Sequence, residues 1–517
     1  MKILGCVALG TMAVSGAAHA DTSVKNSAEW TAAAAAVRPG DTLLLTGQSS
    51  DYPGALTLKG KGDAALAPIT IRTTQPALVL KALVIDGSTH VMVRDLRFAS
   101  SSASALIKIK GSSKVTISGN VFSHAGVQVK QKSVEFSAEG DSRDNVISYN
   151  TFQDFDRSSD STATPAPGAD SGGKPVPASF IQTASALGTH IHHNYFRNIR
   201  PFIQNRTVAG DSGREAIALG TASTQQIAAG TIIESNLFED CDGEDEIISV
   251  KTSKNQIRYN TFKNSYGSLS LRQGQGTKVY SNYFIGAGAG KLPEDPNYQT
   301  GGVRAYGAGH YIYNNYFQGL SGTHARKPIV LDAGDISAAD PDLVSDKHRA
   351  ATKIQVLFNT LIDNAEGISV EPGDAKYVIA AQGNVIANNL VNGKLGTLIN
   401  DRGANTVAAR NIAFPAADAS LGSSGRPSPN QAWTSAEVLE ISPSMVAVTK
   451  NGYVLQAPGS GSHAVGYASD AYPGIKLDID GQARSSAVVG ADDNASGVAE
   501  YRNKPLTARD VGPTARP

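Results

Sequence analysis

The chain has 517 residues, of which 41% are hydrophobic, so it is long enough to bury a large core. Lysine and arginine together number 46, and so do aspartate and glutamate. This balance excludes an overall positive field, so we expect neither a nucleic acid nor a membrane as a partner. Any affinity for a polyanion must come from a local group of cations.

The first 20 residues have the pattern of a secretory signal peptide. Lys2 precedes an apolar run over residues 3–18, and the small-residue motif Ala18-His19-Ala20 provides a cleavage site. We expect the mature chain to begin at Asp21 and to be periplasmic or secreted. No later segment reaches about 18 continuous apolar residues, so we expect no membrane-spanning segment.

An Asn-x-Phe tripeptide, or a close variant of it, recurs along the chain after stretches of alternating apolar residues. The copies begin at Asn120, Asn150, Asn194, Asn236, Asn260, Asn282, Asn315, Asn359 and Asn389. The shortest intervals between copies are 22 and 24 residues. A fixed period of this length is typical of solenoids, and the alternation indicates that the repeating units are strands. The predicted fold is all-β, a right-handed single-stranded parallel β-helix with loop insertions.

The repeated Asn has two predicted roles. Each coil must turn sharply between strands, and Asn tolerates the left-handed backbone conformation better than most residues with a side chain. Equivalent amides stacked from coil to coil can also form a hydrogen-bonded ladder. The aromatic residue two positions later, as in Asn260-Thr-Phe262, is expected to point into the core and stack on its equivalents.

These patterns divide the chain into three parts. Residues 1–20 are the signal peptide, residues 21–420 the β-helix, and residues 421–517 a C-terminal extension. The extension is expected to pack on the β-helix or cap it, because an uncovered terminal coil would expose strand edges. The longer intervals between repeats indicate inserted loops, of which residues 156–179 are the clearest.

Two acidic and two basic residues fall on neighbouring coils of the predicted rod. Glu244 and Glu246 precede Lys251, and Arg272 follows Lys251 by 21 residues. This spacing is close to the repeat length, so the lysine and the arginine are expected on the same side of adjacent coils, about 4.8 Å apart. Strand alternation directs Glu246 inward, so its exposure requires a corner near Glu246 or Ile247. Taken alone, the spacing also fits ordinary charges on a polar sheet face.

Several segments of the chain carry a family resemblance. They are Gly243–Lys251, Ile257–Phe262, Leu269–Gly274, Gly302–Arg304 with Gly309-His310, and Leu506–Pro513. These segments resemble polysaccharide lyase family 6, the alginate lyases and chondroitinase B, and the similarity runs from about residue 22 to the C-terminus. The most specific part is the Glu-x-Glu-x4-Lys block followed by Leu-x-Leu-Arg.

The resemblance implies a β-helix that cleaves uronate polysaccharides by β-elimination, so an acidic polysaccharide is the expected partner. Lys251 matches the family's general base, Arg272 its acid or charge-stabilising arginine, and Glu244 and Glu246 two ligands of a calcium ion. The chemistry agrees with these residue types. A proton beside a carboxylate is weakly acidic until the carboxylate charge is neutralised, and Ca²⁺ prefers oxygen ligands.

The chain departs from the family pattern at two positions. The family's third calcium ligand is an Asn, where this chain has Ser212, so Asp211 or the Ser212 hydroxyl is expected to supply a replacement oxygen. Family members often have a His after the catalytic arginine, where this chain has the neutral amide Gln273.

Further residues are candidates for substrate binding. Arg304 and Arg326 fall on later coils, where their guanidinium groups could hold carboxylates of flanking sugars, although each is also consistent with a solvated surface arginine. His310 is a third candidate, with a structural hydrogen-bonding role as its alternative. The run His190–His193 resembles a metal cluster only superficially, because strand alternation is expected to place its last two histidines on opposite faces.

Several functions stay open. Alginate is the expected substrate because it is the commoner one in the resembling family, with dermatan sulfate as the alternative. A β-helical glycoside hydrolase would use Glu244 and Glu246 as its pair of carboxylates, and a non-catalytic carbohydrate-binding protein would use neither. A lyase releases an unsaturated product that absorbs ultraviolet light, and a hydrolase does not. We expect a monomer or a weak dimer.

Overall fold

The computed structural model describes most of the chain after residue 18. The described residues are 19–124, 130–155, 178–200, 203–204, 207–208, 213–286, 299–336, 346–425, 430–472, 474–484, 487–493, 499 and 501–517. None of the helices in this part of the chain has the length and apolar character needed to span a bilayer.

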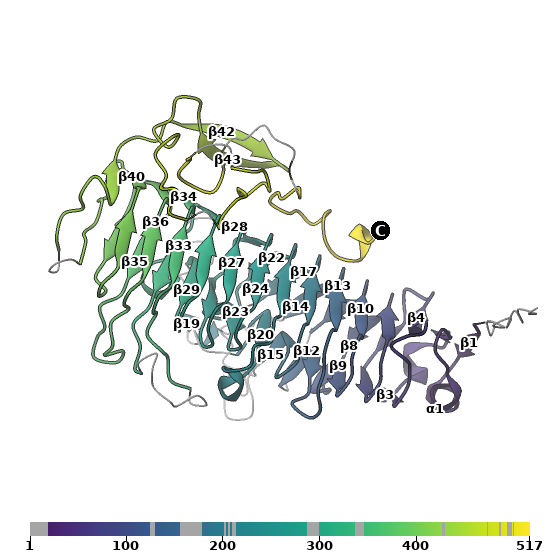
Figure 1. The fold of residues 1–517 in the computed structure, drawn as a ribbon. Coiled ribbons are helices and arrows are strands. Elements are labelled where there is room, and N and C mark those ends of the chain that lie inside the picture. The colour runs from purple at the N-terminus through teal and green to yellow at the C-terminus, as the bar shows by residue number, and fades with distance from the viewer. Residues whose placement is uncertain are drawn as a thin grey trace, which may run out of the picture.

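Three long parallel sheets, which we number 1 to 3, run the length of a rod (Figure 1). Each coil adds one strand to sheet 1, then one to sheet 3 and one to sheet 2, as β7, β8 and β9 do. In spatial order, the 14 described strands of sheet 1 are β1 (Asp21–Val24), β2 (Thr42–Leu45), β4 (Ile69–Thr73), β7 (Val91–Arg94), β10 (Thr116–Ser118), β13 (Val146–Ser148), β16 (His190–His192), β21 (Ile232–Glu234), β24 (Gln256–Arg258), β27 (Lys278–Tyr280), β30 (Tyr311–Tyr313), β33 (Gln355–Leu357), β36 (Val385–Ala387) and β39 (Val407–Ala409).

Sheet 2 has 12 described strands. Its described strands are β3 (Ala55–Lys59), β6 (Ala82–Asp86), β9 (Ala105–Lys110), β12 (Gln131–Phe136), β15 (Ala178–Gln182), β20 (Ile217–Leu219), β23 (Glu246–Val250), β26 (Gly267–Leu271), β29 (Thr300–Ala305), β32 (Ile329–Leu331), β35 (Ile368–Val370) and β38 (Ile399–Asp401).

Sheet 3 closes the cross-section. Its described strands are β5 (Val79–Leu80), β8 (Arg97–Ala99), β11 (Val121–Ser123), β14 (Thr151–Phe155), β17 (Tyr195–Ile199), β22 (Leu237–Cys241), β25 (Thr261–Lys263), β28 (Tyr283–Ile285), β31 (Tyr316–Gln318), β34 (Thr360–Ile362), β37 (Leu390–Gly393), β40 (Asn411–Pro415) and β41 (Val438–Glu440). The predicted all-β, right-handed parallel β-helix is confirmed.

Few elements lie outside the three sheets. They are α1 (Ser27–Ala36), the short pair β18 (Ile203–Gln204) and β19 (Thr207–Val208), the hairpin β42 (Met445–Lys450) and β43 (Tyr453–Pro458), and the 3-10 turns η1 (Ser49–Asp51), η2 (Ala222–Thr224), η3 (His324–Arg326) and η4 (Pro513–Ala515). Asn26 caps α1 by accepting the N–H groups of Ala28 and Glu29. The buried side chain of Trp30 anchors this helix at the N-terminal end of the rod.

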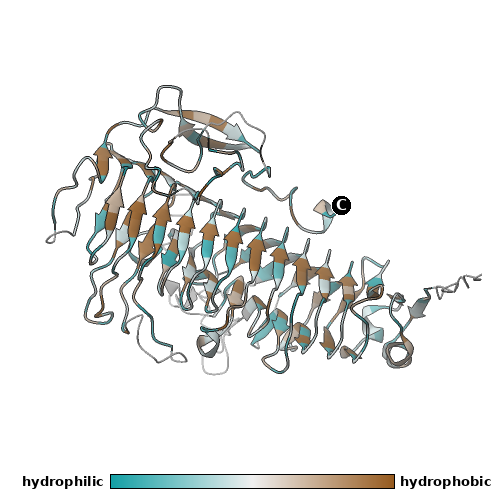
Figure 2. Ribbon diagram, viewed as in Figure 1, coloured by the Kyte–Doolittle hydropathy of each residue, from teal (hydrophilic) through white to brown (hydrophobic). Residues whose placement is uncertain are grey.

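The core inside the coils is a stack of apolar side chains, and hydrophobic residues follow the strands in Figure 2. Successive phenylalanines lie with their rings almost parallel, as at Phe238, Phe262 and Phe284, whose centroids are 4.7 and 4.5 Å apart. The predicted inward aromatic stack is confirmed.

The predicted amide ladder also exists. Asn260 Nδ2 donates to Asn282 Oδ1 at 3.0 Å, and the same oxygen accepts the backbone N–H of Asn260. The left-handed residue, however, is the one before each ladder Asn, as at Tyr259 (φ 57°) and Ser281 (φ 53°). The prediction that Asn itself turns the corner is therefore wrong. Its side chain is fully buried, and its amide is used to join neighbouring coils.

The C-terminal extension still adds β41 to sheet 3, and from β42 onward its described part runs back along that sheet (Figure 1). Gln456 N donates to Tyr316 Oη at 2.7 Å, and Leu506 N donates to Thr261 Oγ1 at 2.7 Å. Near the end of the chain, Arg516 pairs with Asp95 at 2.7 Å. The extension therefore contacts coils that are far apart in the rod.

Candidate active site

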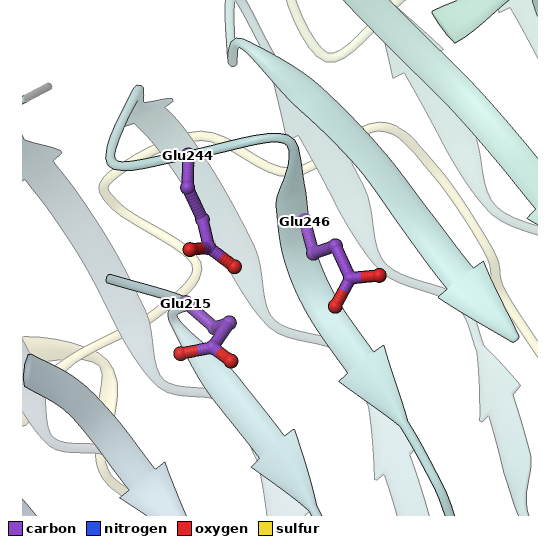
Figure 3. A group of neighbouring side chains, drawn as sticks. All are labelled: Glu215, Glu244 and Glu246. Atoms are coloured by element: carbon purple, nitrogen blue, oxygen red, sulfur yellow. The ribbon is translucent and has the colours of Figure 1, made fainter. Parts of the chain in front are cut away.

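Three glutamates converge on the outer side of sheet 2 (Figure 3). Glu244 lies in the turn before β23, Glu246 begins β23, and Glu215 lies two residues before β20. One oxygen of each carboxylate lies within 4.8 Å of the other two. We refer to Glu215, Glu244 and Glu246 as the carboxylate cluster.

The backbone register explains this convergence. Ile217 of β20 pairs with Ile248 of β23, so Glu215 and Glu246 occupy equivalent places on adjacent coils. The pairing of β23 with β26 shifts between Glu246 and Ile248. Such a bulge re-aims the side chains around it. The bulge lies at the position where a corner was predicted. The Glu246 side chain therefore points away from the apolar core, whereas Ile248 points into it.

Each carboxylate of the cluster has a donor of its own. Glu244 accepts the backbone N–H of Gly213 at 2.5 Å, Glu246 accepts Arg272 Nη1 at 3.1 Å, and Glu215 accepts Ser179 Oγ at 2.8 Å. Only 4% of Glu244 and 7% of Glu246 is exposed. Anions buried this closely require a compensating cation.

The donor set fits a hard divalent cation. Three carboxylates offer up to six oxygens, and Ca²⁺ takes 6 to 8 oxygen ligands in flexible geometry. Of the predicted ligands, the structure brings Glu244 and Glu246 together. Asp211 and Ser212 lie outside the described residues. Glu215, which sequence reasoning missed, supplies the third carboxylate, and its signal was its place two residues before the inward Ile217, as Glu246 stands two residues before Ile248.

Lys251 and Arg272 lie at equivalent positions on adjacent coils. Ser249 pairs with Ser270, and Gln273 N donates to Val250 O at 3.0 Å, so Lys251 lies across from Arg272 and Gln273 on the next coil. Lys251 is partly exposed, and its ammonium group has no hydrogen-bond or ion-pair partner among the described residues. The side chain of Arg272 is 31% exposed and lies against Glu246. A lysine, an arginine and the carboxylate cluster thus share one face.

Aromatic and basic side chains continue this face on the next coil. Tyr306 N donates to Leu271 O at 2.9 Å, so Tyr306 continues the row of Lys251 and Arg272. Arg304 lies two positions earlier, with its guanidinium 4.9 Å from the Tyr306 ring centroid and its Nε 2.6 Å from Asp332 Oδ2.

His348 is a second residue that sequence reasoning missed. Its ring lies 4.5 Å from that of Tyr306, and Gln273 Nε2 donates to Lys347 O at 3.2 Å, which ties this segment to the coil of Arg272. Burial, aided by the charges of Arg272 and Arg304, lowers the pKa of His348 to about 4. The imidazole is therefore neutral at neutral pH.

A cavity of about 290 Å³ opens beside Arg304 on the following coils. Its charged lining residues include Arg304, Lys327, Arg402, Asp332 and Glu371. Lys251 and Arg272 are not among the lining residues, since the cavity begins one coil further along sheet 2. Arginine and lysine side chains in the wall of a cavity of this volume are suited to bind the carboxylate of a sugar unit.

The other two predicted substrate ligands are placed differently. Arg326 pairs with Asp245, donates to Tyr266 Oη at 2.5 Å and lies over the Tyr266 ring, so it borders the turn that carries the carboxylate cluster. His310 is fully buried, and its Nδ1 accepts the backbone N–H of Thr277 at 3.0 Å. This position favours the structural alternative for His310 over contact with substrate.

The histidine run at the end of β16 does not split as expected. His192 and His193 lie with their Nδ1 atoms 2.9 Å apart, because His193 takes a left-handed conformation (φ 53°) and turns back toward its neighbour. His190 bonds Glu234 at 2.7 Å instead. The expectation that alternation places His192 and His193 on opposite faces is wrong, since the strand ends between them.

A right-handed parallel β-helix with carboxylates, a lysine and an arginine on one sheet fits the class of polysaccharide lyases. The family model described as Chondroitinase B matches residues 24–389. The chain belongs to this family of enzymes, within polysaccharide lyase family 6. Among curated proteins, no match was found.

Solved structures agree in fold. The alginate lyase AlyGC of family 6 is 20% identical with a TM-score of 0.64, and the match covers 93% of this chain and 59% of that chain. A family 6 lyase from Pseudopedobacter saltans is 18% identical, with a TM-score of 0.56 and coverage of 95% and 99%. A family 6 alginate lyase in complex with a trisaccharide is 18% identical, with a TM-score of 0.57 and coverage of 94% and 96%. This chain thus spans about three fifths of the length of AlyGC.

Proposed function

We propose that the protein is a secreted lyase that cleaves alginate by β-elimination, with Lys251 as base and Arg272 as the group that stabilises the leaving oxygen. The observation that carries this proposal is the register of the two side chains on adjacent coils, beside Glu246 of the carboxylate cluster. Among the described residues the Lys251 ammonium has no ion-pair partner, and the same sheet carries the buried carboxylates of Glu244 and Glu246.

The reaction removes the proton at C5 of a uronate and expels the O4 glycosidic oxygen. Lys251 takes that proton in its neutral form, and its lack of an acidic partner among the described residues leaves the nitrogen available. Arg272 keeps its charge at any accessible pH and is held by Glu246, so it offers preorganised hydrogen bonds to the leaving oxygen. Proton delivery to that oxygen passes through water.

We propose that Glu215, Glu244 and Glu246 hold Ca²⁺, with oxygen from Asp211 or Ser212 as a further ligand. Support comes from the three converging carboxylates and the hard oxygen donor set. When bound, the ion would neutralise the substrate carboxylate and act as a Lewis acid. The chain's own residues keep the carboxylates in place through Ser179 Oγ and the backbone of Gly213.

Alginate is proposed over dermatan sulfate because two of the similar structures are alginate lyases. Flanking uronates would extend along sheet 2 toward Arg304 and the cavity beside it. We propose that Arg326, which is held at the turn before β23, borders the same path of the polysaccharide along sheet 2. We also propose export through residues 1–20 and a monomer or weak dimer as the working form. A mature N-terminus at Asp21 in exported protein would verify the leader.

The test is incubation of purified protein with poly-mannuronate, poly-guluronate and dermatan sulfate, with and without EDTA. Unsaturated product from either alginate block, abolished by EDTA, is the expected result. Lys251→Ala and Arg272→Ala should each lower kcat by about 10²- to 10⁴-fold. Lys278→Ala, an exposed lysine on sheet 1, is the matched control and should keep full activity.

Three outcomes would contradict the proposal. Activity on dermatan sulfate alone would replace the substrate, and new reducing ends without unsaturated product would indicate a hydrolase. Full activity of the Lys251 variant would remove the proposed base.

A further inference from the structure

Lys132 is a buried lysine that is linked to the carboxylate cluster through the hydroxyl of Ser179. It belongs to β12, two strands before β20 in sheet 2, and only 6% of the residue is exposed. Lysine is rarely buried to this extent without a partner. Its position therefore requires an explanation in terms of nearby charge.

The register of sheet 2 brings Lys132 into the row of the cluster. Lys132 pairs with Ser179 on the next coil, and the pairing of Ile181 with Ile217 carries the same row on to Glu215. Lys132 Nζ donates to Ser179 Oγ at 2.9 Å, and that hydroxyl donates to Glu215 Oε2 at 2.8 Å. The ammonium group is thus linked to the cluster by one hydroxyl.

The charges around Lys132 are those of a counter-ion site. Burial lowers the pKa of Lys132 below its ordinary value, while the carboxylates of Glu215 and Glu244 oppose this shift. Lys108, on the neighbouring strand β9, is instead partly exposed and pairs with Glu135 at 3.4 Å. Of these two lysines, Lys132 is the one whose environment includes the cluster.

We propose that Lys132 is a fixed internal counter-ion of the carboxylate cluster, which holds the cluster together without a metal and opposes the binding of a divalent cation there. This inference rests on the proposed function only in taking the cluster as a calcium site. Its consequence is that the affinity for calcium is set by a lysine that is not a ligand.

The two effects of removing the lysine have opposite signs. Without its ammonium, the carboxylates repel one another, so the metal-free protein loses stability. A bound Ca²⁺ no longer faces a like charge, so calcium binds more tightly. A residue with a purely structural role would lower both the stability and the affinity.

The experiment measures calcium binding by titration calorimetry and thermal unfolding with and without calcium, on EDTA-treated full-length protein. Lys132→Met keeps an unbranched side chain, one atom shorter than that of lysine, and removes the charge. We expect its calcium affinity to rise at least about tenfold, its metal-free Tm to fall, and its Tm gain on adding calcium to exceed that of the native protein. Lys108→Met, the control, should match the native protein in all three.

Further variants keep the test sharp if Lys132→Met folds poorly. Lys132→Arg retains the charge and should bind calcium within about threefold of the native protein, whereas Lys132→Gln should behave as the Met variant does. Equal or weaker calcium binding by the uncharged variants would overturn the proposal, as would the absence of calcium binding in every protein. None of these measurements uses a polysaccharide, so failure of the lyase assay is a separate result.

Discussion

At the scale of single residues, the site depends on charges that the backbone forces together. Glu244 and Glu246 are two residues apart in one segment, and Glu215 reaches them from the preceding coil. Each accepts at least one hydrogen bond, from Gly213, Arg272 or Ser179. These contacts orient the three carboxylates toward one another.

Glu215→Gln should weaken calcium binding at least about tenfold, because one of three anionic ligands becomes neutral while its shape is kept. Lyase activity should fall at calcium concentrations that saturate the native protein and recover at higher ones. Calorimetry and activity against calcium concentration measure both. Glu135→Gln, a part-buried glutamate of the same sheet that pairs with Lys108, should change neither. Unchanged affinity in the Glu215 variant would exclude it as a ligand.

At the scale of elements, the coils are joined by hydrogen bonds that each ladder asparagine makes in two directions. Asn282 Oδ1 accepts both the N–H and the Nδ2 of Asn260, while Asn282 itself donates to Asn315. These groups are fully buried, so no water replaces a lost partner. The ladder therefore sets the spacing on which the site's register depends.

Asn282→Ala should lower the free energy of unfolding by about 2 to 4 kcal/mol, since it leaves two buried donors of Asn260 without an acceptor. Urea unfolding followed by circular dichroism measures this loss. Asn400→Ala, on β38 and only partly buried, should cost less than about 0.5 kcal/mol. Similar losses in the two variants would show that the ladder adds nothing specific.

At the scale of the whole molecule, buried histidines make the fold sensitive to acid. Burial lowers the pKa of His124 to about 3 and of His310 to about 4, from an ordinary value of 6.5. Below pH 6.5 the unfolded chain therefore binds protons that the folded chain does not. This stability is present above pH 6.5 and is lost as the pH falls toward the folded values.

We expect the free energy of unfolding to fall between about pH 6.5 and 4, by up to roughly 3 kcal/mol for each fully buried histidine. Urea titrations at several pH values measure the slope. His310→Asn should flatten it, although the variant starts from a lower stability because Thr277 N loses its acceptor. An unchanged slope in this variant would show that groups other than His310 cause the acid sensitivity. The pKa values of Glu234 and Asp510 are lowered to about 2, so the stability that these carboxylates contribute is lost at a more acidic pH than the stability that the histidines contribute.

Sequence reasoning predicts the parts of this structure that repeat or are local. The ladder and the phenylalanine stack are visible because identical residues return at a fixed period. Glu244, Glu246 and Lys251 were found because they lie in one segment, and Arg272 because an uninterrupted coil separates it from Lys251. Glu215 was missed because its coil follows an insertion that hides the period, and His348 because a segment after another insertion brings it to Tyr306. Contacts of that kind depend on tertiary packing, which spacing does not encode.

The path of the C-terminal extension along sheet 3 has a consequence for how the molecule comes apart. A solenoid whose coils touch only their neighbours can fray from either end, one coil at a time. In this protein one returning segment bonds to Tyr316, Thr261 and Asp95, so it links coils that are far apart in the rod. Loss of that segment would let the coils melt stepwise from the ends of the rod, and proteases would cut the terminal coils before the middle.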